Sequence, residues 1–140
     1  MTREEIVQFF ARRDVALQAR DAKALAATHA EDGLFESPLA GHVVGRSAIE
    51  QFYQSLFASF PDHTIGRTEL LIDGDRAVQI GVASGTNRGG FMGLPPTGKP
   101  FSFALVVVYT LRDGFIVKER IIYDFTGWMV QLGVLKAKPH

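Results

Sequence analysis

The sequence predicts one α+β domain, in which a curved, mainly antiparallel sheet wraps around three N-terminal helices as a cone-shaped barrel. Apolar residues recur at helical spacing before Pro61 and alternate at strand spacing after it. Residues 101–111 are apolar on both faces, which indicates a central strand covered on each side. A chain of 140 residues, 46% of them hydrophobic, suffices for a single domain spanning residues 1–140.

The first two helices are expected to form a hairpin. Thr2 and Glu5 have the spacing of a capping box, and apolar residues then recur at helical spacing to about residue 19. Asp21 can cap a second, shorter helix that runs through His29 and ends at residues 32–33.

A third helix is predicted after a turn-rich link at residues 41–45 that follows a short extended piece at residues 34–38. Ser47 and Glu50 have capping-box spacing, and Pro61 ends the helix. A continuous stripe, which must lie on something apolar, is formed by Ile49, Phe52, Tyr53, Leu56, Phe57 and Phe60.

The remainder reads as an antiparallel meander. Strands are expected at residues 63–72, 75–86, 101–111 and 115–125. The Asp-Gly pairs at 73–74 and 113–114 are hairpin signals, because Asp and Gly tolerate positive φ. The Gly- and Pro-rich residues 89–100 form a longer loop.

Composition excludes several classes of function. Fifteen cationic and fifteen acidic residues are interspersed, so we expect no nucleic-acid partner. No apolar run approaches ~18 residues, so we expect no membrane partner, and a cytoplasmic protein is the working assumption. The chain has no Cys, and its four His show no metal-ligand spacing, so no metal site is expected. Eleven Phe indicate a tight core or a ligand cavity.

A set of turn, cap and strand-end signals has a specific order along nearly the whole chain. It consists of residues 35–38 (Phe-Glu-Ser-Pro), 45–49, 60–62, 73–76, 85–98, Asp124 and 131–133 (Gln-Leu-Gly). In this order the chain resembles the SnoaL-like polyketide cyclases, within the nuclear-transport-factor-two-like and ketosteroid-isomerase-like fold. The resemblance implies aldol-type ring closure of polyketide esters without metal or organic cofactor, an acid/base near the end of the last strand, and a homodimer.

Asp124 matches the family's acid/base. Its neighbours are Ile121, Ile122, Tyr123 and Phe125, and a carboxyl desolvated by such side chains has a raised pKa suited to proton transfer near neutrality. The alternative is an ordinary Asp that caps a short helix beginning around residues 126–127. Glu119, the other carboxylate of this segment, points to the opposite face unless the strand contains a bulge.

The resemblance has two departures. Asn87 stands where members carry His; it can donate a hydrogen bond to a substrate carbonyl but cannot shuttle a proton. In the steroid isomerases of this fold, three polar groups stand where this chain has Ser37, Arg13 and Val106. Steroid isomerisation by the mechanism that uses those groups is therefore disfavoured.

Other candidates have structural alternatives. His42, in a turn near the expected cavity mouth, is a candidate for binding substrate. Tyr53 and Trp128 are candidates for the cavity wall, although core packing is the commoner role of such residues. His29 is expected to close the second helix, and His63 to be structural at a strand start.

The sequence therefore favours a cofactor-independent acid/base enzyme acting on a small apolar molecule that bears a ketone or ester. Asp124 is the expected proton acceptor and donor, and Asn87 the expected polar contact. The alternative is a non-catalytic module of the same fold, which binds a hydrophobic ligand or serves dimerisation.

Overall fold

The structure is a computed structural model that describes residues 1–91 and 93–136. In this part of the chain the helices are α1 (Arg3–Gln18), α2 (Ala22–Ala27), α3 (Arg46–Ser59) and α4 (Phe125–Leu132). The strands are β1 (His29–Ser37), β2 (Gly41–Val44), β3 (Thr64–Asp73), β4 (Arg76–Thr86), β5 (Pro100–Arg112) and β6 (Phe115–Tyr123). Residue 92, in the expected loop at 89–100, and residues 137–140 lie outside the described part.

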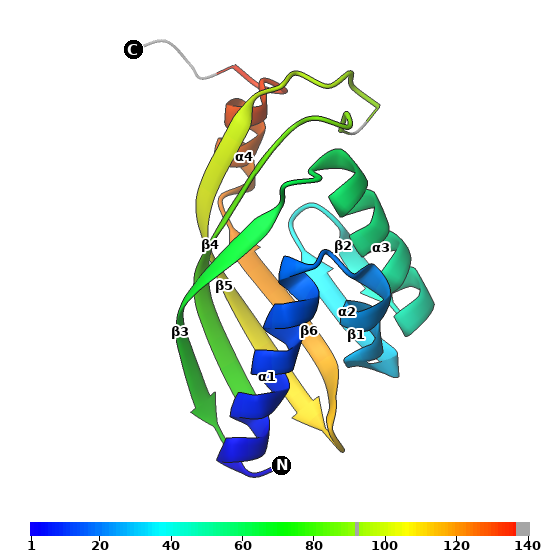
Figure 1. Cartoon of the computed structure of the whole chain (residues 1–140), viewed down its shortest axis with the longest axis vertical. Helices are drawn as coiled ribbons and strands as arrows, with labels where there is room; N and C mark the ends of the chain where they lie inside the picture. Colours follow the sequence, from blue (N-terminus) through cyan, green and yellow to red (C-terminus); the bar gives the residue numbers. More distant parts are fainter. Residues whose placement is uncertain (92, 137–140) are drawn as a thin grey trace.

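The described strands form one sheet in the order β2-β1-β6-β5-β4-β3. β3 to β6 are a meander of antiparallel neighbours, as their Asp-Gly hairpin signals predict. β1 pairs in parallel with β6 and antiparallel with β2, so the sheet is mixed and its edges are β2 and β3. The sheet curves around the helices without closing (Figure 1). The predicted α+β cone is confirmed.

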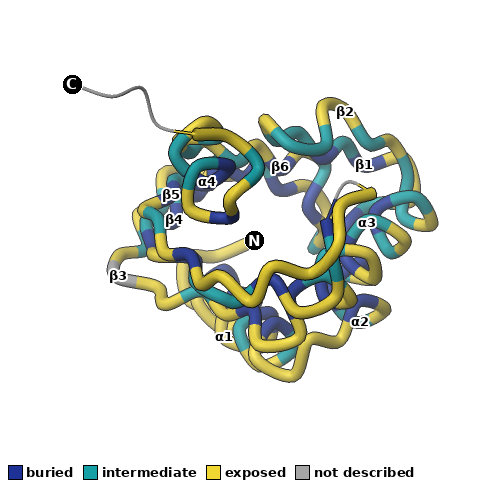
Figure 2. Tube along the Cα trace, turned by 90° about the horizontal axis from the view of Figure 1, so that it is seen from above, coloured by how far each residue is buried: buried dark blue, intermediate teal, exposed yellow. Residues whose placement is uncertain are grey.

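Helices α1, α2 and α3 cover the inner face of the sheet, and α4 lies at its other end, near the loop between β4 and β5 (Figure 1). Seen from above, helices and strands form a ring (Figure 2). Helix α1 buries Ile6, Phe9 and Phe10, and α3 buries its stripe at Ile49 and Phe57. The apolar stripes thus bury one face of each helix, as amphipathic spacing requires.

The elements between α1 and the meander differ in detail from the prediction. α2 ends at Ala27, and His29 opens β1 instead of closing a helix. The predicted turn at residues 41–45 is the strand β2. The predicted capping box at Ser47 is wrong, because α3 begins at Arg46 after Gly45, whose φ of 95° suits glycine and whose N-cap position makes no side-chain bond.

The outward face of β5 is less covered than predicted. The odd-numbered side chains of β5 lie on the inner face and are buried or half-buried, including Leu105, Val107 and Tyr109. On the other face Ala104 is exposed and Val106 is half-buried, so covering by this chain alone is incomplete. In the described residues, no helix is long and apolar enough to cross a membrane.

Candidate functional site

A cavity lies between the helices and the inner face of the sheet. Its free volume is about 60 Å³, well below the roughly 300–1,000 Å³ of pockets that hold drug-sized ligands. The apolar part of its wall includes Phe35, Leu105, Val107 and Ile121, and its polar side chains include Arg13, Tyr53, Gln79, Tyr109 and Glu119. A small apolar cavity with a polar group at one place suits a small ligand with a polar function.

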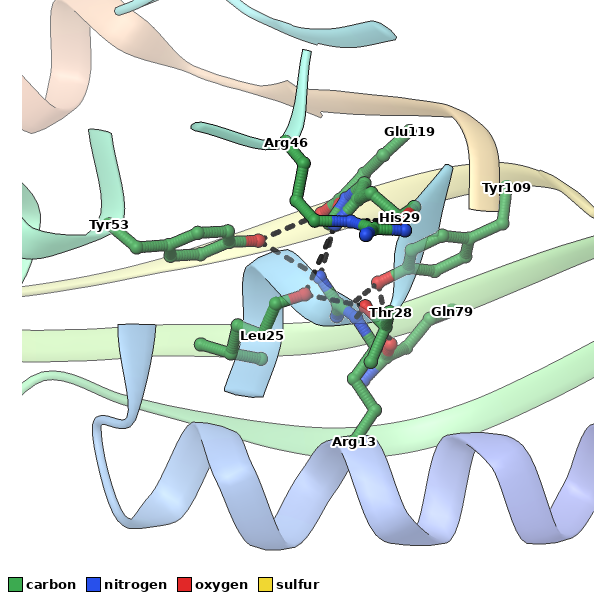
Figure 3. A network of polar contacts seen from close by, with 9 residues as sticks. All are labelled: Arg13, Leu25, Thr28, His29, Arg46, Tyr53, Gln79, Tyr109 and Glu119. Carbon is green, nitrogen blue, oxygen red and sulfur yellow. Dashed lines mark hydrogen bonds and ion pairs between the residues drawn. The ribbon is translucent and has the colours of Figure 1, made fainter. Parts of the chain in front are cut away.

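Arg13 is the centre of this polar group, which we call the cavity floor: Arg13, Tyr53, Gln79, Tyr109 and Glu119. The Arg13 guanidinium is 5% exposed and donates from Nη2 to Glu119 Oε1 and to the Tyr53 hydroxyl, both at 2.9 Å. Its Nη1 donates to the Tyr109 hydroxyl at 3.0 Å, and Tyr109 donates to Gln79 Oε1 at 3.2 Å. Figure 3 shows these side chains converging from separate elements.

The Arg13 guanidinium has one N–H group more than its contacts within the described part of the protein use. Its Nε donates to Thr28 Oγ1 at 3.3 Å, which with the bonds to Glu119, Tyr53 and Tyr109 accounts for four hydrogen bonds. Since a guanidinium carries five N–H groups, Arg13 keeps a donor for a further acceptor. The remaining donor is the second N–H of Nη1, and Arg13 is among the residues that line the cavity.

Glu119 is held from a second side by His29. Glu119 Oε1 lies 2.7 Å from His29 Nε2, and Tyr53 donates to Oε2 at 3.3 Å. His29 Nδ1 lies 3.1 Å from the Leu25 carbonyl oxygen, and Arg46 donates to the His29 carbonyl at 3.0 and 2.7 Å. Both ring nitrogens of His29 therefore lie within hydrogen-bond distance of an oxygen.

Electrostatics keep the Glu119 carboxylate ionised. Burial raises the pKa of Glu119, but the charge of Arg13 and the hydrogen bond from His29 outweigh burial and leave this pKa below its ordinary value. Burial raises the pKa of Tyr53 and of Tyr109 well above the ordinary value, so both hydroxyls keep their protons near neutrality. The floor thus combines one anionic acceptor with protonated hydroxyl donors.

Periodicity explains how the floor is positioned. Arg13 lies on the buried face of α1 together with Phe9, Phe10 and Leu17, which are three or four residues from it. Glu119 is an inward position of β6, and Tyr109, its antiparallel partner, is an inward position of β5. A charged residue within the apolar stripe of α1 could have identified Arg13 as part of the site. From the sequence, Arg13 was considered only as the residue that replaces a polar group of the steroid isomerases.

Asp124 lies in different surroundings from those predicted. It is exposed, and its Oδ1 accepts a hydrogen bond from the Gly127 amide at 3.0 Å as the N-cap of α4. A Cβ at Gly127 would collide with the Asp124 carboxylate, so the glycine leaves room for the cap. The expectation of a desolvated Asp124 is wrong, because apolar sequence neighbours do not determine whether a strand-end side chain is buried.

Asn87 and His42 lie away from the cavity wall. Asn87 is buried, but its Oδ1 accepts from the Gly90 amide at 3.2 Å and its Nδ2 donates to Thr97 Oγ1 at 3.2 Å, within the loop that follows β4. His42 is exposed on the edge strand β2, where Nε2 lies 3.0 Å from Glu36 Oε2. Neither is among the lining residues, so substrate contact by either stays a prediction without geometric support.

The remaining predicted residues do line the cavity. Tyr53, Glu119 and Trp128 are all lining residues, and His63 lines it as well. His29 does not close a helix as expected, because α2 ends earlier and the buried ring contacts Glu119 instead. The geometry thus groups Tyr53 with Glu119 and separates both from Asp124.

The three positions that carry polar groups in the steroid isomerases do not all lie at the cavity. Ser37 and Arg13 line the cavity, whereas Val106 lies on the other face of β5 from the lining residues Leu105 and Val107. Within residues 1–91 and 93–136, no three His, Asp or Glu side chains are grouped so that they could hold a metal ion.

Comparison with known proteins identifies the family. Residues 6–132 match the sequence model described as SnoaL-like polyketide cyclase. The chain belongs to this family. The SnoaL-like match spans every described helix and strand except the first turn of α1.

Solved structures with the same fold include SnoaL-like and related proteins. AclR from Streptomyces galilaeus, a candidate hydroxylase, is 22% identical with a TM-score of 0.84, covering 99% of this chain and 87% of its own. IdmH from Streptomyces antibioticus, a candidate polyketide cyclase, is 28% identical with a TM-score of 0.73. The match covers 91% of this chain and 97% of IdmH. A Catenulispora acidiphila protein with a ketosteroid isomerase-like fold, in complex with trimethylamine, is 18% identical with a TM-score of 0.77. The match covers 99% of this chain and 100% of that protein.

Proposed function

We propose that this SnoaL-like protein is a cofactor-independent acid/base enzyme acting on a small apolar molecule that bears a ketone or ester. The observation that carries the proposal is Glu119, a carboxylate that is 1% exposed and lines an apolar cavity beside two tyrosine hydroxyls. The free volume of about 60 Å³ is less than half that of the roughly 150 Å³ cavity known to hold a benzene ring, so a substrate with one ring requires the cavity wall to move apart on binding.

Glu119, rather than Asp124, is the proposed proton acceptor. It takes a proton from the carbon next to the carbonyl, and the electron pair of that C–H bond moves into the enolate. Arg13, through its remaining N–H, stabilises the negative charge on the oxygen, and the Tyr53 hydroxyl can donate to it as well once protonation of Glu119 Oε2 releases the Tyr53 proton from that oxygen. Glu119 then returns the proton to carbon, as in isomerisation, or to oxygen after closure of a carbon–carbon bond.

Deuterium exchange tests this step without knowledge of the natural substrate. Acetophenone, a one-ring ketone, is incubated with the protein in D₂O, and loss of its methyl proton signal is followed by NMR. The protein should accelerate the exchange, and Glu119→Gln should lower the acceleration by about 10²–10⁴-fold, the usual contribution of a general base. Tyr53→Phe, which keeps the ring, should lower it less.

Asp124→Asn separates the two assignments of the acid. Asn caps helices as well as Asp does, so this variant keeps α4 and removes only the charge. The proposal expects its exchange rate to equal that of the unchanged protein. A rate that falls with Asp124→Asn and persists in a folded Glu119→Gln would return the acid/base role to Asp124 and reject Glu119.

A second candidate function is ligand binding without chemistry. It is favoured by the saturation of Glu119, whose oxygens already receive bonds from Arg13, His29 and Tyr53, and by the lowered pKa of Glu119, which weakens it as a base. Acetophenone that binds to the protein but exchanges no faster than in buffer would favour this candidate.

The outer face of the sheet is the proposed contact with a second copy of the chain. Val82 and Ile122 are 40% and 47% exposed there, and Val106 is half-buried between their strands. Burying apolar side chains of this kind is favourable. Sedimentation equilibrium should give twice the chain mass; a monomer at all accessible concentrations would reject the dimer.

A further inference from the structure

Two ring nitrogens at the cavity wall have no hydrogen-bond partner among residues 1–91 and 93–136. They are His63 Nδ1 and Trp128 Nε1. His63 is 5% exposed and Trp128 is 3% exposed, and both line the cavity. Buried polar groups are nearly always paired, so two unpaired nitrogens on residues that line one cavity indicate a place where something else supplies the partner.

The two residues lie along one aromatic arc. The Phe101 ring packs against both, with centroid distances of 6.4 Å to His63 and 5.4 Å to Trp128. The Phe57 ring connects His63 to the floor, since its centroid is 5.7 Å from His63 and 5.9 Å from Tyr53. His63 and Trp128 are thus separated from Arg13 by rings, and they form a polar place distinct from the cavity floor.

The chemistry of the two rings restricts the partner. Trp128 Nε1–H is a donor only, so it needs an oxygen or nitrogen acceptor. Burial, with a smaller contribution from the positive charge of Arg20, lowers the pKa of His63 to about 4. The His63 ring is therefore neutral near pH 7 and offers one N–H and one bare nitrogen. Such a pair matches a neutral hydroxyl or ketone oxygen.

We propose that His63 and Trp128 form a second polar binding site in the cavity, which takes a neutral hydroxyl or ketone of a flat, ring-containing ligand. The proposal rests on the proposed function for the cavity as a ligand site, and it adds the ligand class: an apolar ring with an oxygen function at each end. One oxygen lies at the floor and the other between His63 and Trp128, while the aromatic arc covers the ring between them.

A matched pair of probes tests the second oxygen. The probes are para-hydroxyacetophenone and para-methylacetophenone, which share the ketone and differ by a hydroxyl in place of a methyl group. Trp128 is the one tryptophan of the chain, so a ¹⁵N-labelled sample gives a single indole N–H signal. The hydroxyl probe should move this signal downfield and bind about 3- to 10-fold more tightly than the methyl probe, as one gained hydrogen bond predicts.

Variants assign the discrimination to the pair. His63→Phe keeps a ring and removes both nitrogens, so the preference for the hydroxyl probe should fall towards onefold while the methyl probe still binds. His42→Asn, at an exposed histidine outside the cavity wall, is the matched control and should keep the preference. The indole signal of the unchanged protein gives a readout that does not depend on the folding of any variant.

Equal affinity for the two probes with an unmoved indole signal overturns the second site. So does a preference that persists in His63→Phe without an indole shift, because the hydroxyl would then bind at the floor. Failure of both probes to bind up to their solubility limits also overturns it. None of these outcomes is the same as absence of deuterium exchange, which concerns the floor alone, so the two proposals can fail separately.

Discussion

Glu119 and Asp124 are carboxylates of one short segment, but they lie in opposite surroundings. Glu119 points inward from β6 and is bound by Arg13 and His29 inside the cavity. Asp124 follows the end of the strand, is exposed, and satisfies a backbone amide of α4. The same functional group is therefore part of an ion cluster at one position and a helix cap at the other.

The difference lies in what each carboxylate requires from the rest of the chain. The cap needs only Gly127, which is close in sequence and leaves space for the carboxylate. The Glu119 carboxylate needs Arg13, which precedes it by 106 residues, and His29, which precedes it by 90 residues. The Glu119 carboxylate is therefore paired only when α1, β1 and β6 are assembled, so these contacts couple three separate elements.

The largest effect is expected from removing the buried charge. Glu119→Gln leaves the Arg13 guanidinium without a counter-charge at 5% exposure and replaces the carboxylate that contacts the buried His29 ring. Breaking a buried ion pair by removing one partner costs about 3–5 kcal/mol, so the free energy of unfolding should fall by about that amount. Urea unfolding followed by circular dichroism measures this change.

Asp124→Asn is the matched control for the same comparison, since it removes one carboxylate charge and leaves the cap intact. Its free energy of unfolding should stay within about 0.5 kcal/mol of the unchanged protein, as for surface substitutions. Similar losses in the two variants would contradict the contrast between a buried cluster and an exposed cap.

The fold was predictable because it depends on periodic patterns that are local. The change from helical to alternating spacing after Pro61 separates α3 from the meander, and the Asp-Gly pairs mark the turns after β3 and β5. The residues at 29–45 were read less well. Strand β2 has four residues, and so short a strand is stabilised by pairing with β1 rather than by a pattern of its own.

The candidate site was predictable only in part. Tyr53 and Trp128 were named as candidates for the cavity wall because aromatic side chains commonly line ligand cavities, and both do line this one. Glu119 was named, but its importance depends on Arg13 and His29, whose contacts join distant parts of the chain. Asp124 was preferred because it matches the family's acid/base and because its sequence neighbours are apolar. Burial, however, is a tertiary property, and a residue just beyond a strand end can turn to solvent.

The pH dependence of stability sharpens the comparison within the cavity. The pKa of His63 falls from 6.5 unfolded to about 4 in the folded protein, mainly through burial. Between these values the unfolded chain binds a proton that the folded protein does not, so stability is lost as pH falls from 6.5 towards 4. At about 1.4 kcal/mol for each pKa unit, His63 accounts for a loss of about 3 kcal/mol.

Glu119 acts in a different pH window. Its folded pKa is below the ordinary value of 4.5, so its contribution is complete above that pH and is lost as pH falls through the folded pKa. Urea unfolding of the unchanged protein and of His63→Phe at a series of pH values separates the two residues. The difference between them should develop between pH 6.5 and 4; parallel curves over this range would show that burial does not lower the pKa of His63 in the folded protein.

A smaller loss of stability than that of Glu119→Gln is expected from removing the exposed Asp124 cap. Asp124→Ala removes the side chain that accepts from the Gly127 amide at 3.0 Å, and loss of an N-cap costs about 1 kcal/mol. Since Trp128 and Met129 of α4 are buried, fraying of the first turn should loosen this wall of the cavity more than the floor. Amide hydrogen exchange should therefore quicken in α4 and stay unchanged at β6 around Glu119. Faster exchange at both places would mean that the cap and the buried cluster form a single cooperative unit, and that Asp124 acts on the site through α4.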